Sequence, residues 1–168
     1  MSVTHTPHHD PACDLVLERL IDVPREPVWL AWTRPELLKR WFCPEPWKLV
    51  DCDLELRPGG IFRTVMRGPD GEESAGTGCL LVVEENAKLV WTDALGPGFR
   101  PAAEPFMTAE IRLAPEGAGT RYTAIARHAT PEARKRHEEM GFHEGWGAAL
   151  DQLIEVAKEL GRRDGRGA

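Results

Sequence analysis

Apolar and polar side chains alternate with a period of two through the middle of the chain, from about residue 47 to residue 127. The alternation is clearest where apolar residues occupy every odd position from Met107 to Leu113. Turn-forming sequences at residues 58–60 and 68–71 bracket a shorter run, Ile61–Arg67, in which Phe62 and Met66 share one face. This period is typical of strands with one buried face. We therefore predict about six antiparallel strands here, after a first strand at residues 14–23.

Glycine and proline mark the turns and irregularities of these strands. A long strand is expected at residues 74–85, where Gly76 and Gly78 indicate a bulge or a tight bend. A short turn at residues 86–87 leads to the next strand, and residues 96–101 are predicted to form a longer loop.

Two short helices are predicted between the first two strands. Val28, Ala31 and Trp32 share one face at helical spacing, so residues 25–32 are expected to form the first helix. Thr33 and Glu36 have the spacing of a capping box, which predicts a second helix that reaches about residue 41. Trp32 is assigned to the core, because its helix would lie beside the end of the sheet.

A long helix is predicted at the C-terminal end of the chain. Thr130 and Pro131 are suited to its first positions, Gly141 is expected to kink it, and Gly161 is expected to end it. Its apolar stripe consists of Trp146, Leu150, Leu153 and Ala157. These elements predict an α+β fold in which a curved six- to seven-stranded antiparallel sheet wraps around this helix. A cavity is then expected between sheet and helix.

Composition limits the class of protein. The chain has 168 residues, 42% of them hydrophobic, which suits a single domain at residues 14–160 with a disordered leader (1–13) and a flexible tail (161–168). The net charge of −6 disfavours general nucleic-acid binding. No apolar run is long enough to span a membrane. The leader lacks the apolar stretch of a signal peptide, and the four cysteines form no C-x-x-C pair, so we expect reduced thiols and a cytoplasmic protein.

Several short sequences, in order along the chain, match one family. They are RLIDVP (19–24), VWLAWT (28–33), RWFCP (40–44), LRPGGIF (56–62), VMRGPDG (65–71), KLVWT (88–92), and GW (145–146) followed by LDQL (150–153). In these stretches the chain resembles the activator of heat-shock protein 90 ATPase homology family, part of the START-like (SRPBCC) superfamily with the birch-pollen-allergen helix-grip fold. The resemblance covers roughly residues 14–160 and implies a cavity for hydrophobic molecules.

The resemblance leaves several functions open. The preferred hypothesis is a non-catalytic cytoplasmic protein that binds a hydrophobic or aromatic small molecule, without cofactor or metal. One alternative is a cyclase or hydrolase that uses His128 and a carboxylate of the long helix, such as Glu138, Glu139 or Glu144. Another is a protein-interaction module with a chaperone partner, as the family's co-chaperones imply. The oligomeric state is expected to be a monomer or a homodimer.

An excess of tryptophan, six residues against one tyrosine, indicates an aromatic pocket wall or an aromatic core. Trp47 belongs to this aromatic set but is not among the residues predicted to bind the ligand. The ligand-binding residues that we predict are Trp41, Phe42, Phe62, Met66, Trp91, Met107, Ile111, His128, Phe142, Trp146 and Leu150.

Titratable residues give weaker signals. His137 and His143 are six positions apart, too far for an i, i+4 metal pair, and a solvated helix face is expected for both. Arg19 shares a face with apolar residues, so we expect it to pair with Asp53 or Glu55, or else to anchor a ligand carboxylate.

Two further sets of chemically capable residues are interpreted as structural. Cys43 has no obvious base nearby and is not predicted to be a nucleophile. The leader residues His5, His8, His9, Asp10 and Cys13 could ligate a metal, but they lack rigid spacing, and a flexible tail is the preferred interpretation.

Overall fold

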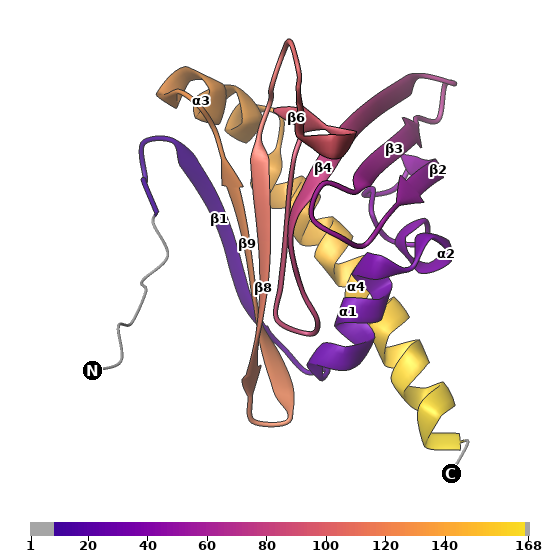
Figure 1. Ribbon diagram of the computed structural model, residues 1–168. Helices are drawn as coiled ribbons and strands as arrows, with labels where there is room; N and C mark the ends of the chain where they lie inside the picture. Colours follow the sequence, from indigo (N-terminus) through magenta and orange to yellow (C-terminus); the bar gives the residue numbers. More distant parts are fainter. Residues whose placement is uncertain (1–8, 167–168) are drawn as a thin grey trace.

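The computed structural model describes residues 9–166, which fold into a curved sheet that partly encloses a long C-terminal helix (Figure 1). The sheet is antiparallel and seven-stranded, with the strand order β1-β9-β8-β5-β4-β3-β2. Its strands are β1 (Asp14–Ile21), β2 (Lys48–Leu54), β3 (Ile61–Arg67), β4 (Glu73–Glu84), β5 (Lys88–Thr92), β8 (Thr108–Glu116) and β9 (Gly119–Arg127). The predicted α+β architecture is confirmed.

The helices lie at the start and at the end of the chain. The first two, α1 (Arg25–Thr33) and α2 (Pro35–Leu38), connect β1 to β2, as predicted. The last two, α3 (Pro131–Glu139) and α4 (Phe142–Arg166), follow β9, and α4 packs against α1 (Figure 1). The expected loop at residues 96–101 contains a small ribbon of β6 (Leu95–Gly96) and β7 (Arg100–Pro101), joined by the 3-10 turn η1 (Pro97–Phe99).

The core forms where the inward faces of the strands meet the apolar stripe of α4. Alternating residues of β8 and β9, such as Ile111 and Tyr122, are buried, as the period of two requires. On α4, Phe142 is buried near the start of the helix, and from Ala149 onward the buried positions follow helical spacing: Ala149, Leu150, Leu153, Val156 and Ala157. Trp146, one turn earlier, is only partly buried. The stripe therefore fills the space over the sheet at one end and leaves it open at the other.

The C-terminal helix is broken rather than kinked. Thr130 caps α3 as predicted, because its hydroxyl accepts a hydrogen bond from the Ala133 N–H at 3.1 Å. Gly141 has a φ of 94°, in the left-handed region that favours glycine, so it ends α3 and lets α4 begin in a new direction. The prediction that Gly161 ends the helix is wrong, since α4 continues to Arg166. An ion pair between Arg163 and Glu159, one turn apart, spans Gly161 at 3.0 Å.

The predicted capping box is also wrong. Thr33 is the last residue of α1, and its hydroxyl donates to the Trp29 carbonyl at 2.7 Å instead of capping α2. Arg34 is the N-cap of α2 and makes no capping contact with its side chain. Because α2 already ends at Leu38, Trp41 lies in the loop that follows it.

Two strand details differ from the prediction. The β1 strand ends at Ile21 rather than at residue 23. The irregularity in β4 lies between Leu80 and Val82, not at the glycines. Gly78 is needed for a different reason: a Cβ there would lie 2.4 Å from the Thr92 carbonyl oxygen, so only glycine allows this approach of the two chains.

Part of the leader is ordered. The prediction for residues 1–8 lies outside the described residues. Further on, Asp10 accepts hydrogen bonds from the backbone N–H groups of Cys13 and Asp14, at 3.0 and 2.8 Å, and so forms a turn before β1. The Cys13 carbonyl in turn accepts a hydrogen bond from the His128 N–H at 3.1 Å. Residues 10–14 therefore form a turn that leads into β1.

Candidate functional site

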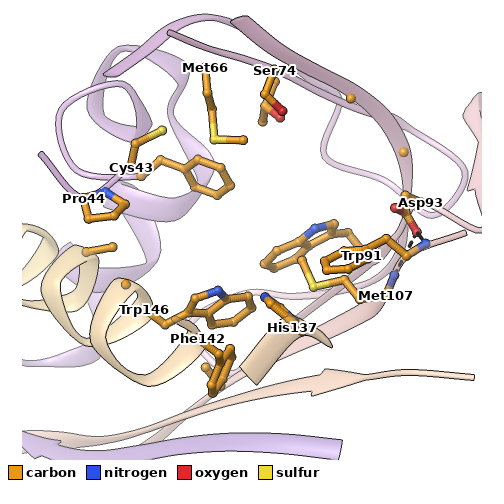
Figure 2. Close-up of a pocket in the computed structure, with 18 of the residues that line it drawn as sticks. Cys43, Pro44, Met66, Ser74, Trp91, Asp93, Met107, His137, Phe142 and Trp146 are labelled. Atoms are coloured by element: carbon orange, nitrogen blue, oxygen red, sulfur yellow. Dashed lines mark hydrogen bonds between the residues drawn. The ribbon is translucent and has the colours of Figure 1, made fainter. Parts of the chain in front are cut away.

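A cavity of about 560 Å³ lies between the concave face of the sheet and the N-terminal half of α4 (Figure 2). Its size falls within the range of small-molecule sites, roughly 300–1,000 Å³. Residues of β1, β3, β4, β5, β9, α1, α3 and α4 line it, together with the loop after α2 and the segment before β8. Open space remains here because the closely packed part of the α4 stripe begins at Ala149, whereas Trp146, one turn earlier, is only partly buried.

Five aromatic side chains form a connected cluster on one side of the cavity, which we call the upper aromatic cluster. The rings of Phe62 and Trp91 are stacked, with centroids 4.9 Å apart and an angle of 25° between their planes. Trp32 links Trp91 to Trp41, with centroid distances of 5.1 and 4.6 Å. Phe42 completes the cluster, with its centroid 5.9 Å from Trp41 and 6.2 Å from Phe62. These contacts fix the rings in place before any ligand binds.

Most polar atoms of the upper aromatic cluster are already paired within the protein. The indole N–H of Trp41 donates to the Ala31 carbonyl at 2.9 Å, and that of Trp32 donates to the Tyr122 hydroxyl at 3.1 Å. Burial raises the pKa of Tyr122 well above its ordinary value, so its phenol stays neutral. This wall therefore presents mainly aromatic faces and edges to the cavity.

A second cluster, the lower aromatic cluster, lies on the opposite side of the cavity, around the break between α3 and α4. Phe142 and Trp146 are one turn apart on α4, with ring centroids 4.7 Å apart (Figure 2). The imidazole of His137 lies 6.0 Å from Trp146 and 4.8 Å from Phe106, centroid to centroid. The two clusters face each other across the open space.

His137 is the largest departure from the predicted site. We expected it on a solvated helix face, but it is 7% exposed and lines the cavity. Its Nδ1 lies 2.9 Å from Nε2 of His128, whose Nδ1 lies 2.8 Å from the Cys13 carbonyl oxygen. Burial, together with the nearby His128, lowers the pKa of His137 to about 4, so its imidazole is neutral at neutral pH. His143, by contrast, is exposed, as expected.

His128 supports the cavity wall from behind. Both of its ring nitrogens are used, one toward the Cys13 carbonyl and one toward His137, and it does not border the cavity. The alternative in which His128 and a helix carboxylate form an acid–base pair therefore lacks its geometry. Glu138 lies near His143 instead, at 3.6 Å.

Gln152 holds the loop that carries part of the upper aromatic cluster. Its side-chain amide donates to the carbonyls of Trp41 and Cys43 at 2.9 and 2.8 Å, and its side-chain oxygen accepts from the Glu45 N–H at 3.2 Å. One residue of α4 thus pairs three backbone groups of this loop. No pattern in the sequence singled out this role.

Asp93 organises the other end of the cavity. Its Oδ1 accepts hydrogen bonds from the backbone N–H groups of Phe106 and Met107 at 2.7 and 3.0 Å (Figure 2). This carboxylate fixes the segment that places Met107 in the cavity wall and Phe106 against His137.

The cavity opens to solvent along β4. Residues 74–77 border it and are exposed, and so is Met140 across from them, next to the helix break. Gly76 pairs with Thr64 of β3, which faces the cavity, so Gly76 shares that inward face. A Cβ at Gly76 would meet no atom within 4 Å, which means that it would extend into open space.

Most of the predicted site residues are brought together, although their contact with a ligand stays a prediction. The nine that line the cavity are Trp41, Phe42, Phe62, Met66, Trp91, Met107, Phe142, Trp146 and Leu150. Ile111 is 1% exposed and belongs to the core, and His128 lies behind the wall. Trp32, assigned to the core, is buried and also borders the cavity, whereas Trp47 does not border it.

Arg19 pairs with neither of the predicted carboxylates. Its guanidinium lies 2.7 Å from Asp151 of α4, and Asp53 pairs with Arg63 instead. Glu55 is in an ion pair with Arg57. Arg19 does not border the cavity, so the cavity gains no ligand anchor from it.

Cys43 borders the cavity as a neutral thiol, because burial raises its pKa to about 11. Among the side chains that the structure describes, those of residues 9–163, no three histidine, cysteine or acidic groups come together in a way that could hold a metal ion. The same part of the chain contains no helix long and apolar enough to cross a membrane.

A curved antiparallel sheet closed over a long C-terminal helix, with an apolar cavity between them, defines a helix-grip protein of the START-like class. The family model described as "Activator of Hsp90 ATPase homolog 1-like protein" matches residues 22–158. The chain belongs to this family, and the resemblance seen in its sequence is confirmed.

Solved structures agree with this assignment. A crystal structure of a protein from Nitrosomonas europaea is 51% identical, with a TM-score of 0.89, and the match covers 92% of this chain and 99% of that one. A crystal structure of a Rhodobacter sphaeroides protein is 25% identical, with a TM-score of 0.78 and coverage of 91% and 97%. An AHSA1-like protein from Aeromonas hydrophila, 21% identical with a TM-score of 0.67 and coverage of 88% and 94%, shares the fold. No curated protein matches the chain.

Proposed function

We propose that this protein binds a neutral, largely apolar small molecule, with at least one aromatic ring, in the cavity between the sheet and α4. The observation that carries the proposal is the pair of facing aromatic clusters around about 560 Å³ of open space. A protein that needed these aromatic rings only for its core would leave no open space between the two clusters, since protein interiors are close-packed. Here they are fixed by contacts to one another and still leave faces and edges free.

The charges around the cavity favour a neutral ligand over an anion. None of the described residues that line the cavity is a lysine or an arginine, and Asp93 borders it. A buried anion needs a cation or several hydrogen-bond donors to offset its lost hydration. A fatty-acid carboxylate would find neither a lysine nor an arginine at this wall. A neutral aromatic compound fits the same wall without that cost.

The state of the cysteines bears on the compartment in which the protein works. All four cysteines are free thiols, and three of them are buried, which suits a protein that works in a reducing compartment. We therefore place the binding function in the cytoplasm.

The experiment that tests the proposal fills the cavity from its mouth. The variant Gly76→Leu adds a side chain where a Cβ meets open space, so the fold should be retained while the ligand volume shrinks. The neutral probe N-phenyl-1-naphthylamine brightens in apolar surroundings and reports binding directly. We expect the wild-type protein to bind it with saturation, and Gly76→Leu to bind it about 10-fold more weakly or worse, as loss of a well-filled pocket implies.

Gly147→Leu is the matched control. Gly147 lies on α4, does not border the cavity, and its Cβ would also meet no atom within 4 Å. This variant should keep the wild-type affinity. Equal probe binding by wild type and both leucine variants would place the probe outside the cavity, and no saturable binding by the wild type would remove the proposed function.

A further inference from the structure

His137 gives the cavity one polar atom that the protein itself does not use. Nδ1 of His137 is paired with His128, but Nε2 has no hydrogen-bond partner among residues 9–163, whose side chains the structure describes. Within the same residues, Arg19 Nε is the only enclosed side-chain nitrogen or oxygen atom that lacks a partner. His137 Nε2 therefore keeps accessible surface, and His137 borders the cavity beside Trp146 (Figure 2).

The hydrogen bonds behind His137 determine which of its nitrogens carries the proton. A backbone carbonyl can only accept a hydrogen bond, so Nδ1 of His128, 2.8 Å from the Cys13 carbonyl oxygen, must be the donor. When the His128 ring carries this one proton, its Nε2 is a bare acceptor. Nδ1 of His137 must donate to it across 2.9 Å, which leaves Nε2 of His137 without a proton. The Cys13 carbonyl, acting through His128, thus makes Nε2 of His137 a hydrogen-bond acceptor on the cavity wall.

We propose that His137 Nε2 is a fixed hydrogen-bond acceptor in the binding site, and that the ligand is an aromatic compound with a neutral hydroxyl or N–H donor that reaches it. This inference rests on the proposed function and narrows its ligand class. Phe106, Phe142 and Trp146 contact the imidazole, so a ligand that fills the adjoining cavity would displace water from the acceptor and strengthen the hydrogen bond. Placing an aromatic ring against Trp146 brings a ring hydroxyl beside the imidazole. A compound of the same shape without the donor leaves Nε2 buried and unpaired, which costs binding free energy.

The test compares three compounds that share one ring system by calorimetric titration at pH 8: 2-naphthol has a hydroxyl donor, 2-methoxynaphthalene has an oxygen that can only accept, and naphthalene has no polar atom. We expect wild-type protein to bind 2-naphthol about 5- to 10-fold more tightly than 2-methoxynaphthalene, the effect of one well-shielded hydrogen bond. His137→Phe keeps an aromatic ring and removes the acceptor, so the preference for 2-naphthol should disappear while 2-methoxynaphthalene binds as before or better. His137→Gln places an amide oxygen near the former Nε2 and should restore part of the preference. His143→Phe, on the exposed face, is the control and should retain all of it.

A second measurement tests the acceptor without any ligand. The nitrogen-15 spectrum of the histidine rings at pH 8 should show His137 protonated at Nδ1 and unprotonated at Nε2, and His137 should change tautomer population in His128→Phe. A proton on Nε2 of His137 in wild type, or equal affinity for 2-naphthol and 2-methoxynaphthalene, overturns the inference and leaves the proposed function standing. If none of the three compounds binds, the proposed function fails, and the inferred ligand class fails with it.

Discussion

Replacing Trp146 with alanine should weaken ligand binding while costing the fold little. The ring is partly buried and contacts Phe142 on one side, while its other side borders the cavity. Removing it enlarges a space that is already open instead of creating a new enclosed void, so the cavity component of a core substitution is largely absent. About half of a tryptophan's burial free energy is lost, which amounts to about 1–2 kcal/mol of unfolding free energy.

Trp41→Ala provides the matched comparison. Trp41 also borders the cavity, but it is 3% exposed and its indole N–H donates to the Ala31 carbonyl, so its removal loses more packing and leaves an unpaired buried acceptor. We expect a loss of about 4–5 kcal/mol for this variant. Urea unfolding curves of both variants measure the difference directly.

Trp146→Ala should have a clear effect on ligand affinity, in contrast to its small effect on stability. Loss of this stacking surface should reduce the binding free energy of N-phenyl-1-naphthylamine by about 1–3 kcal/mol, measured by fluorescence titration of the folded variant. The reasoning is refuted if Trp146→Ala destabilises the protein as much as Trp41→Ala and leaves probe affinity unchanged. Trp146 would then be an ordinary core residue.

Three further predictions follow from particular contacts. Folding lowers the pKa of His137 from 6.5 to about 4, so on acidification the unfolded state takes up the proton first. The unfolding free energy should keep the whole His137 contribution above about pH 6.5 and should fall by about 2–3 kcal/mol as the pH drops toward 4. Urea unfolding curves across this pH range should show that His137→Phe lacks this pH-dependent loss of stability. The same pH dependence in the variant would assign the loss to other groups. Gln152→Leu leaves three backbone groups of the loop at residues 41–45 unpaired, so we expect a loss of about 2–3 kcal/mol of unfolding free energy and weaker probe binding. Wild-type stability and affinity in this variant would mean that water replaces the amide. Thr130→Ala removes the cap of α3 and should cost about 1 kcal/mol in a thermal melt, whereas Thr130→Asp should cost almost nothing; equal losses would argue against the cap.

Much of the fold could be predicted because its strands have one apolar face. The run Ile61–Arg67 was bracketed correctly by its turns, and its inward residues Phe62 and Met66 line the cavity. The long helix was also predicted from its stripe. Its end was misplaced because a single glycine in a helix costs only about 1 kcal/mol, which neighbouring contacts outweigh.

The candidate site was harder to predict, because tertiary contacts decide it. His137 lies on α3, a mostly polar helix of nine residues, whose composition alone indicates a solvated face. Its burial depends on the break at Gly141, after which α3 packs against α4 and β1 and His137 meets His128. The capping box failed for a similar reason: the Thr33 hydroxyl has a nearer acceptor within α1. Spacing along the chain contains neither fact.

The indole N–H signals of the six tryptophans test the central claim most directly. In the structure Trp32, Trp41, Trp91 and Trp146 border the cavity, whereas Trp29 and Trp47 do not. Titration of nitrogen-15-labelled protein with 2-methoxynaphthalene, followed by two-dimensional NMR, should shift the four cavity signals together with a single dissociation constant. The signals of Trp29 and Trp47 should stay in place. Saturating compound that shifts none of the four, or that shifts only Trp29 and Trp47, would contradict a binding site between the sheet and α4.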